Sequence, residues 1–138
     1  MTHLRKATAA AGALLAVAAL LAAGPAQAAP AGTRGDDYLY LTVTQGENLS
    51  GEARGTVLLC DPPQGYSHAA ETCAELAATG GDIGRLTPAK DAMCPMVYAP
   101  VTAQASGQWN GRPIEYRETF PNSCQMAART GPVFALDD

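Results

Sequence analysis

The sequence predicts an α+β domain in which about five antiparallel strands form a single layer, packed with two short helices and held by two disulfides. Three observations lead to this fold class. Short apolar runs have the pattern of strands that are buried on one face. Two other segments have the caps and spacing of short helices. Four cysteines occur in a chain of only 138 residues, and in a small exported domain such cysteines indicate a disulfide framework.

Five segments have the residue pattern of strands. In the first segment, leucine and valine alternate with tyrosine and threonine, and the others are short apolar-rich runs bounded by turn residues. Ser106-Gly107 and Asn110-Gly111 favour turns, so the third and fourth segments are expected to pair as an antiparallel hairpin. The expected strands are residues 38–45, 54–60, 101–105, 114–120 and 133–136.

Two short helices are expected between these strands. Thr72 and Glu75 have the spacing of a capping box, and Gly80-Gly81 supplies a stop signal about two turns later. Asn122 or Ser123 would cap the second helix, which a Gly-Pro pair ends. The expected helices are residues 73–79 and 124–129, and a turn-rich loop fills residues 61–72.

The N-terminal residues have the pattern of a secretory signal peptide. A short basic region at 3–6 precedes an Ala/Leu run at 7–23, and Ala-Gln-Ala at 26–28 is a pattern that signal peptidases cut. A membrane anchor is the alternative, because the run is nearly long enough to span a bilayer. The cleavage pattern favours removal of residues 1–28, so we expect a secreted, extracellular protein without a membrane segment.

The remaining chain is expected to form one domain over residues 38–138, preceded by a flexible arm at 29–37 that has no apolar periodicity. Removal of residues 1–28 leaves 7 of the 9 basic residues against all 13 acidic ones, a net charge of about −6. This acidic balance argues against a basic nucleic-acid-binding surface. Nucleic acid is therefore not an expected partner.

The four cysteines are expected to form two disulfides, and the sequence leaves three pairings open. Zinc binding is the alternative, but the chain has no Cys-x-x-Cys pair, and His68 is the only histidine after the signal segment. We therefore expect no metal and no cofactor. The cysteines are Cys60, Cys73, Cys94 and Cys124.

Residues 93–100, Met-Cys-Pro-Met-Val-Tyr-Ala-Pro, are expected to form a rigid, extended loop that presents apolar side chains to a partner. Its two prolines keep the backbone extended on both sides of Met96. If Cys94 is bridged, the loop loses little conformational freedom when a partner binds. In the alternative interpretation, Met96 and Val97 are core residues of a strand, which the prolines disfavour.

An enzyme is the competing functional class. A serine hydrolase would need His68 between a serine and an acid, but the sequence has no Gly-x-Ser-x-Gly motif. Bridged cysteines cannot act as thiol nucleophiles. We therefore expect no catalytic residues. A second alternative to the main interpretation is a secreted, disulfide-stabilised binding module for a different protease or protein.

Several motifs resemble those of the Streptomyces subtilisin inhibitor family, over essentially the whole chain after the signal segment. Residues 93–98 resemble the reactive-site sequence of this family. Other matching motifs are Cys60-x-Pro62, Gly65, His68, Cys73-Ala74-x-Leu76, the segment 76–82, Trp109-x-Gly111 and Asn122-x-Cys124. The chain departs from the family pattern at Ala69, where proline is common, at Ala99, where aspartate is frequent, and in a shorter loop between the first two cysteines.

The resemblance implies a five-stranded antiparallel sheet with two helices, a homodimer formed through the sheets, and substrate-like inhibition of subtilisin-like serine proteases. It implies the disulfides Cys60–Cys73 and Cys94–Cys124. It also implies that Met96 is the primary specificity residue and that Met96–Val97 is the reactive bond. An unbranched apolar side chain suits broad apolar pockets, so chymotrypsin-like enzymes are further expected partners.

The neighbours of the reactive bond are expected to contact the protease or to support the loop. The expected contacts are Met93, Cys94, Pro95 and Tyr98, although Tyr98 could instead pack on the inhibitor's own surface. Asn122 is expected to lie beneath the loop and hydrogen-bond its backbone, and the alternative is that it only caps a helix. Because a tethered loop keeps the amine released at Val97 in place, resynthesis of the bond should outrun hydrolysis.

Overall fold

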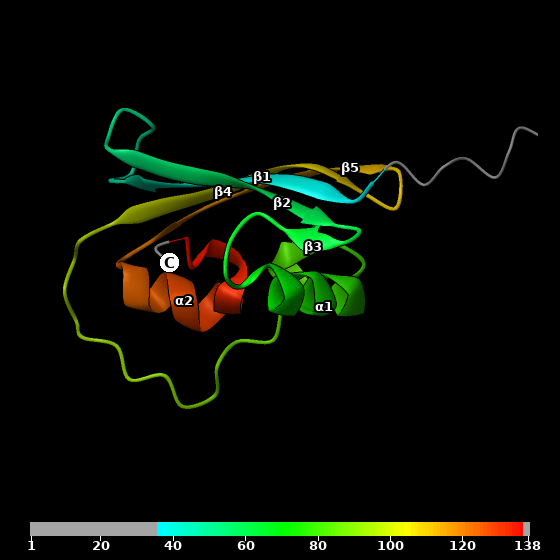
Figure 1. The fold of residues 1–138 in the computed structure, drawn as a ribbon. Helices are drawn as coiled ribbons and strands as arrows, with labels where there is room; N and C mark the ends of the chain where they lie inside the picture. The colour runs from blue at the N-terminus through cyan, green and yellow to red at the C-terminus, as the bar shows by residue number, and fades with distance from the viewer. Residues whose placement is uncertain (1–35, 137–138) are drawn as a thin grey trace, which may run out of the picture.

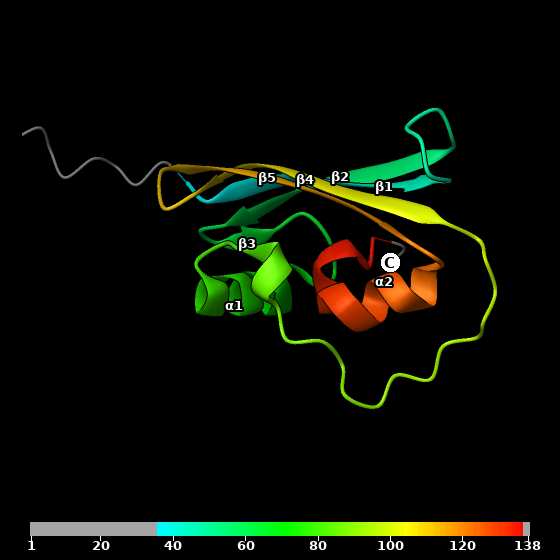
Figure 2. The same cartoon turned by 180° about the vertical axis from the view of Figure 1, so that it is seen from behind.

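A five-stranded antiparallel sheet carries both helices on one of its faces (Figures 1 and 2). The computed structural model describes residues 36–136, so the expected signal peptide and all but the end of the expected arm lie outside the described residues. The strands, in the spatial order β3-β2-β1-β4-β5, are β1 (Tyr38–Gln45), β2 (Ala53–Cys60), β3 (Pro63–Gln64), β4 (Val101–Trp109) and β5 (Arg112–Phe120).

The helices are short and are joined to two 3₁₀ turns. They are α1 (Ala69–Thr79), η1 (Ile83–Arg85), α2 (Ser123–Thr130) and η2 (Gly131–Phe134). None of the helices in the described part of the chain has the length and apolarity needed to cross a membrane. Since α1 and α2 lie side by side under the same face of the sheet, no helix within residues 36–136 covers the opposite face (Figure 1).

The central strand β1 confirms the two-residue period predicted from the sequence. Leu39, Leu41 and Val43 are buried, whereas Tyr40 is 55% exposed on the other face. The inward side chains pack in one core with Leu58 of β2 and Leu76 of α1. Burial of this alternating set therefore fixes which face of the sheet meets the helices.

The hairpin of β4 and β5 has a tighter turn and longer strands than expected. The turn consists of Asn110 and Gly111, whose φ angles are both positive, at 49° and 74°, as a two-residue hairpin turn of type I′ requires. Ser106-Gly107 was expected to be a turn, but both residues lie within β4 and pair with β1 and β5. The prediction failed there because a glycine can also sit in a strand where another backbone approaches closely.

Helix α1 begins four residues before the expected start. His68 occupies the N-cap position without a side-chain capping bond, so the expected capping box of Thr72 and Glu75 is wrong. Thr72 is instead fully buried inside the helix. At the other end, Gly80 adopts the left-handed conformation and caps the helix with its N–H, as the glycine pair predicted.

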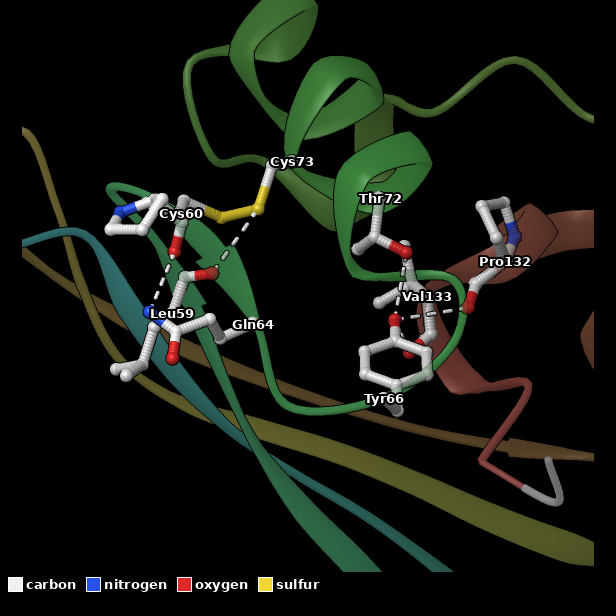
Figure 3. The surroundings of a disulfide bond; sticks show 9 residues. Leu59, Cys60, Gln64, Tyr66, Thr72, Cys73, Pro132 and Val133 are labelled. Atoms are coloured by element: carbon white, nitrogen blue, oxygen red, sulfur yellow. Dashed lines mark hydrogen bonds between the residues drawn. A yellow bond between two sulfur atoms is a disulfide. The ribbon is translucent and has the colours of Figure 1, made fainter.

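The buried Thr72 is explained by Tyr66, which precedes the helix (Figure 3). The Tyr66 hydroxyl lies 2.7 Å from Thr72 Oγ1 and donates to the carbonyl oxygens of Pro132 and Val133 at 3.1 and 3.0 Å. Burial raises the pKa of the Tyr66 phenol to about 12. This hydroxyl thus joins the expected loop and the adjacent helix α1 to η2, which is distant in the sequence.

The last expected strand, residues 133–136, is absent. Residues 131–134 form the 3₁₀ turn η2 instead, and Val133 and Phe134 are buried in the core because the turn packs beneath the sheet. The fifth strand is β3, which lies inside the segment expected to be a loop and pairs with the end of β2. The number of strands was therefore predicted correctly, but the position of one strand was wrong.

Asp37 fastens the end of the expected arm to the sheet. Its carbonyl oxygen accepts a hydrogen bond from Cys60 N at 3.0 Å. Its carboxylate accepts a second bond from Asn110 N at 2.6 Å, in the hairpin turn. The end of the expected arm is therefore tied both to β2 and to the hairpin turn.

Candidate functional site

The candidate site is the irregular segment between η1 and β4, of which residues 93–100 are called the reactive loop below. The segment bows outward past α2 before it enters β4 (Figures 1 and 2). Met96 is completely exposed, and Met93 is 96% exposed. Val97 and Tyr98 are also exposed, which excludes the alternative in which Met96 and Val97 are core residues of a strand.

Two disulfides have the pairing that the resemblance implied. Cys94–Cys124 joins the reactive loop to the first turn of α2, with Cα atoms 5.6 Å apart. Cys60–Cys73 joins β2 to α1, with Cα atoms 5.5 Å apart (Figure 3). The first of these bonds is a covalent anchor just before Met96.

Asn122 combines the two roles that the sequence left as alternatives. Its Oδ1 accepts a bond from Gln125 N at 2.9 Å, so it is the N-cap of α2. Its Nδ2 donates to the carbonyl oxygens of Pro95 and Val97, at 3.2 and 2.9 Å. Since Asn122 is 7% exposed, one buried amide holds the carbonyls on both sides of Met96 from below.

Backbone hydrogen bonds add further anchors that sequence reasoning missed. Ala99 N donates to Pro121 O at 2.8 Å, two residues after Val97. Ala89 N donates to Ala128 O at 2.8 Å, so the segment leading to the loop also touches α2. Main-chain contacts of this kind place no demand on side-chain type, so no sequence signal could have identified them.

Tyr98 contacts a residue that the sequence did not indicate. Its hydroxyl donates a hydrogen bond to the carboxylate of Glu47, in the connection between β1 and β2. This bond is the main reason that the pKa of the Tyr98 phenol is raised. Glu47 is an exposed acid in a loop, a setting that gives no periodicity or motif from which the contact could have been predicted.

The geometry of Asn122 allows its two roles to be separated by substitution. Asn122→Asp retains an oxygen that can cap α2 but loses both donations to the reactive loop, whereas Asn122→Ala loses all three bonds. Because removal of an N-cap costs about 1 kcal/mol, we expect Asn122→Ala to be less stable than Asn122→Asp by roughly this amount in urea unfolding. Equal free energies of unfolding would contradict the capping role.

The loop donations should be visible in both variants by amide hydrogen exchange. The Ala99 amide, which is bonded to Pro121 O, is expected to exchange faster in Asn122→Asp and in Asn122→Ala than in the unchanged protein, because the loop loses its support from below. Protection equal to that of the unchanged protein in Asn122→Asp would show that the amide does not hold the loop.

The residues of the competing enzyme interpretation lie elsewhere in the fold. His68 is at the N-terminus of α1, with Nδ1 3.7 Å from Glu71 Oε2 and its ring edge-on to Tyr66. All four cysteines are in disulfides. Within residues 36–136, no group of three or more His, Cys, Asp or Glu side chains is arranged to hold a metal ion.

Comparison with known proteins identifies the relatives of this chain. Residues 36–122 match the family model described as subtilisin inhibitor-like. A putative serine protease inhibitor of Streptomyces avermitilis is 54% identical over 127 residues, covering 92% of this chain and 86% of the relative. The subtilisin inhibitor of Streptomyces albogriseolus is 41% identical over 123 residues, covering 86% and 83%.

A solved structure has the same fold. It is the crystal structure of Streptomyces caespitosus sermetstatin in complex with Bacillus licheniformis subtilisin. It matches with a TM-score of 0.63 and 32% sequence identity, and the match covers 75% of this chain and all of that one. The similarity therefore extends over the whole of that inhibitor chain.

Proposed function

This chain belongs to the subtilisin inhibitor-like family, and from that premise we propose that it is a secreted inhibitor of subtilisin-like serine proteases that presents the Met96–Val97 bond as a substrate mimic. The family is one of protease inhibitors, not of enzymes. The observation that carries the proposal is a completely exposed Met96, held between two carbonyls that both bond to Asn122.

The loop is suited to bind as a substrate does. Proteases bind peptide substrates as extended strands through main-chain hydrogen bonds. Pro95 has no N–H to donate to the protease, but Met96 has both a backbone N–H and a carbonyl. The Met96 side chain is completely exposed. In the complex, Met96 enters the apolar specificity pocket, and its carbonyl lies in the oxyanion hole of the protease.

Slow hydrolysis follows from the anchors on both sides of the bond. Attack by the protease serine produces an acyl-enzyme on the Met96 side, which Cys94–Cys124 keeps attached to α2. The Val97 side stays in place through Asn122 and through the bond from Ala99 N to Pro121 O. The released amine therefore remains beside the acyl group at high effective concentration, and the peptide bond re-forms.

A titration of protease activity tests this proposal. Subtilisin is mixed with increasing amounts of the purified protein, and residual activity is measured with a chromogenic peptide. We expect activity to fall to zero near equimolar protein, with chymotrypsin inhibited less strongly. Undiminished subtilisin activity at excess protein would reject the proposal, and peptide hydrolysis by the protein alone that is lost in His68→Ala would favour the enzyme class.

We also propose that two copies associate through the open face of the sheet. In the described part of the chain that face has no helix over it (Figure 2), and it exposes Tyr40, Val57 and Leu59. Tyr40 and Val57 are directly paired across β1 and β2, so the exposed apolar side chains form one patch. A patch of this kind on a sheet is suited to pack against an identical sheet.

The proposed dimer can be tested by substitution in the exposed patch. Val57→Asp should give a monomer in analytical ultracentrifugation at micromolar concentration, because an unpaired carboxylate would be buried in the interface. Leu49→Asp is the matched control, since Leu49 is also exposed but lies outside the strands, in the connection between β1 and β2. A dimer that persists in Val57→Asp would place the interface elsewhere.

A further inference from the structure

The connection between β1 and β2, residues 46–52, lies against the part of the reactive loop that follows the Met96–Val97 bond. Gly46 N donates to Pro100 O at 2.7 Å, and Thr102 Oγ1 donates to Gly46 O at 2.8 Å. The next residue, Glu47, accepts the hydrogen bond from the Tyr98 hydroxyl. The connection is thus fixed to the start of β4, and its acid reaches back over the loop.

These contacts come from a different side of the fold than the other anchors. The disulfide and Asn122 both belong to the start of α2. Glu47 is 51 residues from Tyr98 in the sequence, and it holds a side chain of the loop, not its backbone. It is therefore a separate restraint on the segment that leaves when the reactive bond is cleaved.

We propose that Glu47 is a positioning residue for the inhibitory reaction, which fixes Tyr98 and thereby keeps the Val97 amine in place for resynthesis of the reactive bond. This inference rests on the proposed function. Glu47 takes no part in the covalent step and acts through Tyr98.

The chemical step that depends on this position is the reversal of acylation. In the forward direction the protease serine oxygen bonds to the Met96 carbonyl carbon, the bond from that carbon to Val97 N breaks, and the amine leaves with a proton supplied by the protease histidine. In the reverse direction the Val97 amine attacks the acyl ester, the peptide bond re-forms, and the serine oxygen regains a proton. Every ångström of drift of Val97 lowers the rate of this return.

A hydrogen bond to a carboxylate is strong enough to matter for this geometry, because bonds to charged groups are about twice as strong as neutral ones. The bond also gives a spectroscopic signature, since it raises the pKa of the Tyr98 phenol. Tyr98 is otherwise exposed, so loss of the bond would leave its ring free to change rotamer. Val97, its direct neighbour in the chain, would then be held less firmly.

The test compares Glu47→Ala, Glu47→Gln, Tyr98→Phe and the double variant Glu47→Ala/Tyr98→Phe with the unchanged protein. Each is incubated with subtilisin, and cleavage between Met96 and Val97 is followed by mass spectrometry beside the inhibition constant. We expect Glu47→Ala to be cleaved roughly 10-fold faster and to inhibit roughly 10-fold more weakly. Glu47→Gln retains a hydrogen-bond acceptor, so its cleavage rate and inhibition constant should be close to those of the unchanged protein. The double variant should be cleaved no faster, and should inhibit no more weakly, than either single variant.

Glu52→Ala is the matched control, because Glu52 is an exposed acid in the same connection. All variants should unfold at the same temperature, and Glu47→Ala, unlike Glu52→Ala, should lower the pKa of the Tyr98 phenol in NMR titration. Cleavage of Glu47→Ala at the rate of Glu52→Ala, with inhibition by the unchanged protein intact, would overturn the inference and leave the proposed function standing. Failure of the unchanged protein to inhibit any serine protease would overturn both.

Discussion

Replacement of Cys94 and Cys124 by serine is expected to turn the inhibitor into a substrate that subtilisin cleaves between Met96 and Val97. The disulfide joins the loop to α2 two residues before Met96. It is the covalent anchor of the fragment that stays on the protease as the acyl group. Without it, the acyl fragment can shift relative to the Val97 amine, so water competes successfully for the ester.

The expected effect is large because a native disulfide in a small secreted domain contributes about 2–5 kcal/mol. If half of this free energy restrains the loop, the cleavage rate rises by roughly 5- to 60-fold. The measurement is a time course with a catalytic amount of subtilisin, in which mass spectrometry follows the cleaved product. Both cysteines are replaced together so that no free thiol remains.

The control for this experiment is loss of the other disulfide. Cys60→Ser/Cys73→Ser also removes one bridge, but it frees β2 from α1 and not the reactive loop. At a temperature where both variants are folded, we expect only the Cys94/Cys124 variant to be cleaved quickly. A loop that stays intact in that variant after long incubation would contradict the role of the tether.

The sequence predicted the elements whose signal is local. The limits of β1 follow from an alternating run of apolar residues, and α2 follows from Asn122 as its cap, to within one residue at each end. The start of α1 was wrong because its first turn is stabilised by Tyr66, whose hydroxyl reaches Thr72 and the distant η2. Contacts between segments far apart in the chain leave no periodicity to detect.

The same distinction applies to the candidate site. Prolines and a cysteine marked residues 93–100 as an extended, anchored loop, and a resemblance to known inhibitors indicated the reactive bond within it. Glu47 could not be identified from the sequence, because an exposed acid in a loop is ordinary. Its contact with Tyr98 depends on how the β1–β2 connection folds against β4, which is known only once the sheet is assembled.

Substitution of Met96 by lysine is expected to redirect the inhibitor from subtilisin toward trypsin. Met96 is completely exposed, so the change should leave the free energy of unfolding within about 0.5 kcal/mol of its original value. Any change in affinity then arises in the complex. Lysine has nearly the length of methionine, but it carries a charge that an apolar pocket must desolvate and that the acid in a trypsin-type pocket can pair.

We expect inhibition of trypsin to strengthen by roughly 1,000-fold, since one central residue in a desolvated pocket can contribute about 4 kcal/mol or more, and inhibition of chymotrypsin to weaken by a comparable factor. Inhibition constants for subtilisin, chymotrypsin and trypsin measure the shift. Met93→Lys is the matched control, because Met93 is 96% exposed in the same loop and adds the same charge three residues earlier. If Met96→Lys leaves the order of the three proteases unchanged, or if Met93→Lys produces the same shift, then Met96 does not occupy the specificity pocket, and the reactive bond must be sought at another position of the loop.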